Sequence, residues 1–185
     1  LDFLKRVLTL DFQHSYTSEQ KETWLSFVLR WQQLTGAIMA KGFEDTALYG
    51  YNRLVSLNEV GGNPRSVGLS IDDFHHQNTA RLERWPHALN ATSTHDTKRS
   101  EDVRARINVL SEIPEEWEKH LIRWHQWNKL KKRKVDGLAV PESNIEILLY
   151  QTLLGAWPFF SDEVSEFMER LKAYMVKAVR EAKVY

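Results

Sequence analysis

The segment SNIEILLYQTLL, residues 143–154, decides the predicted fold of this chain. From Ile145 to Leu154 it is almost continuously apolar, which is typical of a helix that is buried on most of its sides. Ser143 and Glu146 have the spacing of a capping box, in which each side chain bonds the other residue's backbone N–H at the start of a helix. We therefore predict a core helix that begins at this serine.

Amphipathic segments lie on either side of this core helix. Pro114 suits the first turn of a helix, and the apolar residues behind it recur at helical spacing up to Leu130. The lysine-rich residues 129–134 follow, where cations complement the helix dipole, and Asp136-Gly137 then indicates a turn. Beyond the core helix, the same spacing predicts a last helix that begins near Ser161.

The beginning of the chain predicts two further helices. Thr17 and Gln20 have capping-box spacing in front of an apolar stripe that extends to Ile38. Residues 47–55 repeat the stripe, and the run Gly61-Gly62-Asn63-Pro64 then stops any helix, because glycine is flexible and proline lacks an N–H donor.

The middle of the chain predicts a helix, a strand and another helix. Ser70 can cap a helix that ends at Trp85, since the following proline disfavours helical geometry there. Residues 88–93 have no helical stripe and open into the polar residues 94–97, which indicates a strand and then a turn. Apolar residues between 103 and 110 mark the next helix. The predicted fold class is therefore mainly α, with six or seven helices around one short strand that ends at His95-Asp96.

Composition narrows the possible functions. The 25 Lys and Arg residues balance the 25 Asp and Glu residues, so nucleic acid is not an expected partner. No cysteine is present, which excludes disulfides and favours the cytoplasm. No apolar run is long enough to span a bilayer, so no membrane partner is expected. The first residue is Leu1, and the last residues still have a helical pattern, so we expect a fragment of a longer protein.

A dense polar run at residues 93–102 is the leading candidate site. It lies where the predicted strand ends and a helix begins, a place where a rigid strand aims side chains into a cleft. His95 and Asp96 are the strongest candidates within it. The alternative is that Asp96 or Thr97 only caps the helix, with Glu101 and Asp102 in ordinary ion pairs, and spacing alone favours that alternative. We expect no metal site and no cofactor, because His75-His76 lacks the spacing of a helical metal site.

Four motifs in order make the sequence recognisable. They are MAKGFEDTA at residues 39–47, YNRL at 51–54, LNEVGG at 57–62 and STHDTKRSEDVRAR at 93–106. Together they resemble the maltooligosyltrehalose synthase family of the α-amylase superfamily, most closely between residues 32 and 117. The chain would then be a helical, bundle-like fragment of a larger (β/α)₈-barrel enzyme, a fold that needs about 250 residues.

The resemblance implies a division of the chain and a reaction. Residues 1–87 would be a helical region inserted in or following the barrel, residues 88–110 a barrel strand with its helix, and residues 111–185 a C-terminal helical region. The enzyme would convert the reducing-end α-1,4 linkage of a maltooligosaccharide to an α,α-1,1 linkage by intramolecular transglucosylation. Its partners would be the α-1,4-glucan substrate and the missing barrel portion of the same polypeptide.

The resemblance also implies residue roles. Asp96 would be the third acidic residue of the site, a stabiliser of the transition state, and His95 would bind the same sugar ring. Lys41, Glu44 and Arg99 would contact the substrate. No segment here matches the family's nucleophile or its acid/base, so the fragment alone is expected to be inactive.

Two other functions stay open at this point. The first is that of another glucanotransferase of the α-amylase superfamily, which would leave the motif at residues 41–46 unexplained. The second is that of an autonomous helical interaction module, because amphipathic stripes alone describe an ordinary helical domain.

Overall fold

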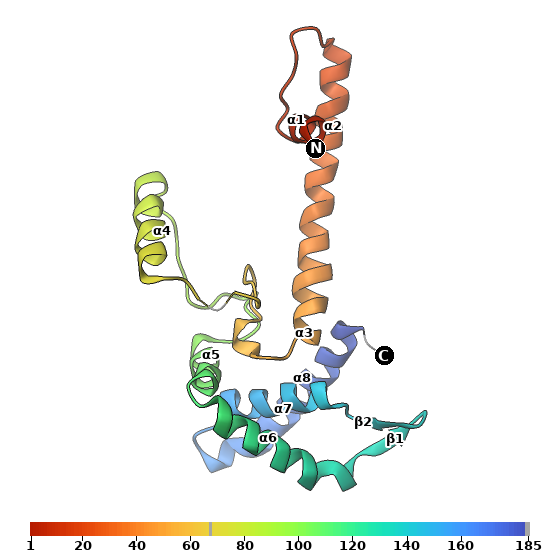
Figure 1. Cartoon of the computed structure of the whole chain (residues 1–185), viewed down its shortest axis with the longest axis vertical. Helices are drawn as coiled ribbons and strands as arrows, with labels where there is room; N and C mark the ends of the chain where they lie inside the picture. The colour runs from red at the N-terminus through yellow and green to blue at the C-terminus, as the bar shows by residue number, and fades with distance from the viewer. Residues whose placement is uncertain (67, 184–185) are drawn as a thin grey trace. The chain divides into compact units, whose positions relative to one another are not determined.

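The computed structural model describes residues 1–66 and 68–183. Within them the chain is mainly helical, with one small β-hairpin, and this part of the predicted fold class is confirmed (Figure 1). The chain divides into two compact units, Leu1–Asp45 and Thr46–Tyr185.

The first unit contains α1 (Asp2–Leu8) and α2 (Ser18–Ile38), and the π-helix η1 (Met39–Ala47) crosses the boundary between the units. The elements of the second unit are α3 (Leu48–Gly50), the 3₁₀ turn η2 (Val55–Leu57), α4 (Ile71–Arg84), α5 (Glu101–Asn108), η3 (Val109–Ser111), α6 (Pro114–Asn128), η4 (Lys129–Lys131), β1 (Arg133–Val135), β2 (Leu138–Val140), α7 (Ser143–Ala156), η5 (Ser161–Glu163) and α8 (Val164–Ala182).

The first unit is organised around the start of α2. The predicted capping box is present, because the Gln20 N–H donates to Thr17 Oγ1 over 3.2 Å and the Thr17 N–H donates to Gln20 Oε1 over 2.9 Å. Trp24, one turn further on, has the rings of Phe3, Phe12 and Tyr16 within 6.1 Å of its own, centroid to centroid. These aromatic contacts attach α1 and the following loop to α2.

The core of the second unit lies where α5 and α7 meet. Ile107 of α5 and Leu148 of α7 are almost completely buried, and α8 adds Ala178. At Gly155 of α7, a Cβ atom would lie only 2.8 Å from the Ile107 side chain, so the two helices touch closely at this glycine. The prediction that α7 is a core helix is confirmed.

The capping box predicted at the start of α7 is wrong. The N-cap residue is Glu142, without a side-chain cap, and Glu146 points elsewhere. Its buried carboxylate accepts from Lys132 Nζ at 2.6 Å and lies 2.8 Å from His125 Nδ1. Burial raises the pKa of Glu146, but the hydrogen bonds to Lys132 and His125 outweigh it, and the pKa lies below its ordinary value.

The helix predicted over residues 47–55 is largely absent. Only α3 is α-helical there, and the chain then runs irregularly into η2. The side chain of Gln151, from α7, donates to Asn52 O at 2.9 Å and accepts from the Val55 N–H at 2.9 Å. Because a buried amide satisfies these backbone groups, the segment has no need of a helical ladder.

The strand predicted to end at His95-Asp96 is also absent from residues 88–96, all of which the structure describes. A strand needs a neighbouring strand to satisfy its backbone, and this segment has none beside it. The strands of the described chain are instead β1 and β2, an antiparallel hairpin in which Arg133 pairs with Val140. Its turn is at Asp136-Gly137, as predicted, and both residues have positive φ.

Candidate active-site loop

The candidate site is the segment of residues 93–101, called here the His-Asp loop, whose last residue is the first residue of α5. Ser100 is the N-cap of that helix, and its hydroxyl accepts from the Val103 N–H at 3.5 Å. Neither Asp96 nor Thr97 therefore caps α5, and the alternative that one of them is the helix cap is wrong. The Asp96 carboxylate is not used as the cap of this helix.

Two threonines shape the turn that carries His95 and Asp96. The Thr97 hydroxyl donates to Thr94 O at 2.8 Å, and the Thr94 N–H donates back to Thr97 Oγ1 at 3.3 Å. The Asp96 N–H donates to Thr94 Oγ1 at 3.3 Å. The threonine side chains thus bond the turn internally.

The side chains of His95 and Asp96 project from this turn. They are 91% and 72% exposed, and His95 Nε2 lies 3.4 Å from Asp96 Oδ2. Such a pair can accept and donate hydrogen bonds to a polyhydroxylated ligand, and the carboxylate can stabilise positive charge that develops beside it. The turn therefore presents these two side chains outward.

The first and last residues of the His-Asp loop are joined directly. The Glu101 N–H donates to Ser93 Oγ at 3.0 Å, and the Ser93 hydroxyl donates to the Glu101 carboxylate. This bond from Ser93 is the main reason that the pKa of Glu101 lies below its ordinary value.

A residue that sequence reasoning missed lies under the loop. Glu59 comes from the motif LNEVGG, in which the sequence analysis assigned no site residue. Its carboxylate accepts from the Lys98 N–H at 2.6 Å and the Arg99 N–H at 3.2 Å. Arg104 adds a salt bridge to Glu59 at 3.3 Å and donates to Arg99 O at 2.9 Å. The sequence signal for Glu59 was its place in one of the four motifs that carry the resemblance, and no role was assigned to it there.

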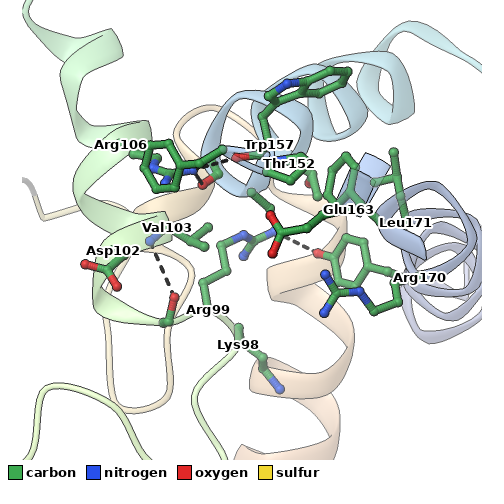
Figure 2. Close-up of a pocket in the computed structure, with 17 residues that line it drawn as sticks. Lys98, Arg99, Asp102, Val103, Arg106, Thr152, Trp157, Glu163, Arg170 and Leu171 are labelled. Carbon is green, nitrogen blue, oxygen red and sulfur yellow. Dashed lines mark hydrogen bonds between the residues drawn. The ribbon is translucent and has the colours of Figure 1, made fainter. Parts of the chain in front are cut away.

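Arg99 points away from the turn into a cavity of about 510 Å³ formed by α5, α7 and α8. Figure 2 shows its guanidinium reaching toward α8, where it donates to the Tyr174 hydroxyl at 2.7 Å. It also donates to Val55 O at 3.2 Å. On the other side of the cavity, Arg106 donates to Trp157 O at 3.0 Å.

The other two predicted site residues belong to the first unit. Lys41 and Glu44 lie on η1, and Lys41 Nζ forms an ion pair of 2.6 Å with Asp45, one helical turn further on. His95, Asp96 and Arg99 belong to the second unit. The grouping of all five around one substrate stays a prediction from the resemblance.

Residues 1–66 and 68–183 contain neither a metal-binding cluster nor a membrane-spanning helix. No group of three or more His, Cys, Asp or Glu side chains there could hold a metal ion. None of the helices in this part of the chain is long and apolar enough to cross a membrane.

No family model matches the chain, but similar proteins and solved structures carry the name of one enzyme. A Mycobacterium tuberculosis protein assigned to maltooligosyl trehalose synthase is 42% identical over 155 residues, which are 83% of this chain and 19% of that protein. A crystal structure of a maltooligosyl trehalose synthase is 43% identical with a TM-score of 0.71, over 92% of this chain and 22% of the other. The Arthrobacter ramosus maltooligosyltrehalose synthase is 39% identical with a TM-score of 0.69, over 90% and 21%. The chain thus spans about a fifth of the length of these relatives.

Proposed function

Because this chain corresponds to a segment of maltooligosyltrehalose synthases, we propose that it is the part of such an enzyme that presents His95 and Asp96 to the substrate. The whole enzyme would act on α-1,4-glucans, converting the linkage at the reducing end to an α,α-1,1 linkage by intramolecular transglucosylation. The observation that carries the proposal is the exposed His95-Asp96 pair on an internally bonded turn, within a chain that matches these enzymes over most of its length.

In the proposed mechanism, Asp96 stabilises charge and does not attack the sugar. Cleavage of a glycosidic bond passes through an oxocarbenium-like state in which the ring flattens and its anomeric carbon becomes positive. Hydrogen bonds from the ring hydroxyls to a carboxylate become stronger as the ring distorts, and they therefore stabilise the transition state. His95 would bind the same ring through a hydrogen bond.

The nucleophile and the acid/base would come from the rest of the enzyme. Retaining chemistry needs two carboxylates about 5 Å apart, and no motif for either was identified in the sequence. We propose that these groups belong to a (β/α)₈ barrel, that residues 88–93 become its strand when neighbouring strands pair with them, and that this chain alone has no turnover.

Lys41, Glu44 and Arg99 complete the proposal as substrate-binding residues. A transferase must retain the released glucose against water until it reorients, and Lys41 and Glu44 on the leaving-group side would raise its effective concentration. The enzyme needs no cofactor in this scheme, and we place it in the cytoplasm.

The comparisons favour this proposal over the two alternatives. Another α-amylase-superfamily glucanotransferase would share the His-Asp pair but not the closely matching segments at both its sides. An autonomous interaction module would have no reason to keep a similarity of 42% identity to an enzyme over 155 residues.

The experiment is the substitution Asp96→Asn in the full-length enzyme. The amide keeps the shape but loses the charge, so turnover of maltopentaose to the trehalose-ended product should fall by about a thousandfold or more. Asp136→Asn is the matched control, because Asp136 is an exposed aspartate in the hairpin turn, at a φ of 50° that asparagine also adopts. Near-normal turnover by Asp96→Asn would reject the proposed role.

A further inference from the structure

Glu59 is held in a tightly folded piece of backbone. The Gly62 N–H donates to Glu59 O at 2.8 Å, and Gly61 has a φ of 72°, which favours glycine. A Cβ atom on Gly62 would lie 2.9 Å from Glu59 O, so only glycine fits there without a shift of the backbone. The side chain of Glu59 is 17% exposed. The folded backbone and the burial of the side chain therefore fix the position of the Glu59 carboxylate.

Both oxygens of this carboxylate accept hydrogen bonds from the backbone. Oε1 accepts from the Lys98 N–H at 2.6 Å and from the Val60 N–H at 2.9 Å. Oε2 accepts from the Arg99 N–H at 3.2 Å and from Arg104 Nη1 at 3.3 Å. Hydrogen bonds to a charged acceptor are about twice as strong as neutral ones. One side chain thus joins two segments that are 39 residues apart.

The two loop amides that Glu59 binds follow Asp96 almost directly. Peptide groups are planar, so fixing two successive N–H directions at Lys98 and Arg99 fixes the course of the chain at that point. The loop has no strand ladder to hold its backbone, and the other hydrogen bonds of that backbone are internal or to α5. The Arg99 side chain adds bonds to Val55 O and to the Tyr174 hydroxyl. Glu59 and Arg104, which binds both Glu59 and Arg99 O, therefore determine where the turn leaves the body of the unit.

We infer that Glu59 is a positioning residue for His95 and Asp96: it places the pair in the active site by binding the backbone of the loop that carries them. It does not itself touch the substrate. The inference rests on the proposed function for what the loop does, whereas the bonds from Glu59 to the loop can be tested without that function.

Glutamine at this position gives a sharp test. A carboxamide has one acceptor oxygen, and its NH₂ group is a donor, so in either orientation it keeps one pair of the four hydrogen bonds and turns a donor toward the other pair. Glu59→Gln should therefore release either Lys98 or Arg99, and Glu59→Ala should release both. Glu146→Gln is the matched control, since its bonds go to His125 and Lys132 and not to the loop.

The first measurement is backbone amide hydrogen exchange in this chain. We expect exchange at the released amides to accelerate by about tenfold or more, as for the loss of a charge-assisted hydrogen bond, while α7 amides keep their rates in Glu59→Gln. In Glu146→Gln the Lys98 and Arg99 amides should keep their relative protection. Unchanged exchange at both amides in folded Glu59→Gln and Glu59→Ala would overturn the inference. If Glu59→Ala loses its helical circular dichroism, the near-isosteric Glu59→Gln decides the question.

The second measurement is turnover of maltopentaose by the full-length enzyme. Glu59→Gln should lower kcat by about ten- to a hundredfold and change KM much less, because a displaced stabiliser is missed mainly in the transition state. Glu146→Gln should lower Tm without this loss of kcat. Faster amide exchange with unchanged kcat would overturn the positioning role if Asp96→Asn is inactive. If Asp96→Asn is active, the proposed function is wrong, and the positioning role is wrong as well because it depends on that function. The exchange data then still decide whether Glu59 holds the loop.

Discussion

Glu59 and Glu146 are two largely buried carboxylates of the second unit that bind different kinds of partner. Glu59 accepts from two backbone N–H groups of an irregular loop and from one arginine. Glu146 binds the side chains of His125, Lys132 and Tyr150, which come from α6, its C-terminal extension and α7 itself. The Glu59 region fixes the path of a chain segment, whereas the Glu146 region joins helices that apolar packing already holds.

The contrast leads to opposite expectations for substitution. Loss of a carboxylate that holds a loop should disturb the loop and its exposed side chains while leaving the core intact. Loss of a carboxylate that neutralises a buried lysine should weaken the whole unit, because the lysine stays buried without a partner.

The largest expected effect on stability is at Glu146. Glu146→Ala leaves the Lys132 ammonium, whose side chain is only 9% exposed, without its carboxylate. We expect the free energy of unfolding, measured by urea denaturation, to fall by about 3 kcal/mol. The double variant Glu146→Leu/Lys132→Met should recover most of that loss, because it removes both charges. A single variant as stable as the unmodified chain would show that this ion pair does not hold the helices together.

A smaller effect is expected at the helix contact that both regions share. Gly155→Ala would place a methyl group 2.8 Å from Ile107, where α5 follows the His-Asp loop and α7 carries Glu146. Forcing the helices apart should cost about 1–3 kcal/mol in thermal or urea unfolding. Gly36→Ala, at a helical glycine of α2 with nothing within 4 Å of the added Cβ, is the control and should stabilise slightly. Equal stability of Gly155→Ala and the unmodified chain would contradict the close packing.

The pH dependence of stability should come partly from Glu146. Its pKa in the folded chain lies below the value of 4.5 of an unperturbed glutamate, so the unfolded chain binds the proton more readily. This contribution is complete above pH 4.5 and is lost as the pH falls through the lower folded pKa. Urea unfolding between pH 7 and pH 3 should therefore show a steeper acid loss in the unmodified chain than in Glu146→Gln. Identical slopes would contradict the lowered pKa.

The smallest expected effect is at Ser93, on the surface of the other region. Ser93→Ala removes the hydrogen bond that lowers the pKa of Glu101, so that pKa should rise toward its ordinary value in an NMR titration. Because Glu101 is exposed, we expect no measurable change in the urea midpoint. An unchanged Glu101 pKa would show that Ser93 does not hold this end of the loop.

Much of the helical fold could be predicted because its signals are local. The Thr17–Gln20 capping box, Pro114 at the first turn of α6 and the Asp136-Gly137 turn each depend on residues within a few positions of one another. Apolar spacing likewise identified α7 as a core helix, since Leu148 on that helix is almost completely buried. His95 and Asp96 were found as a dense polar run, and their significance came from the resemblance.

The remaining features depend on partners far away in the sequence, and only the tertiary structure decided them. Gln151 donates a hydrogen bond to the backbone of Asn52, 99 residues earlier. The segment around Asn52 is therefore irregular, where the sequence predicted a helix. Glu146 fits a capping box by spacing, but a buried lysine 14 residues earlier is a stronger partner for a carboxylate than a solvated N–H group. The strand expected at residues 88–93 does not form, because no neighbouring strand lies beside this segment. Sequence spacing determines helices and caps, since those bonds close within a few residues, whereas the partner of a charged or strand-forming group depends on which segments the fold brings together.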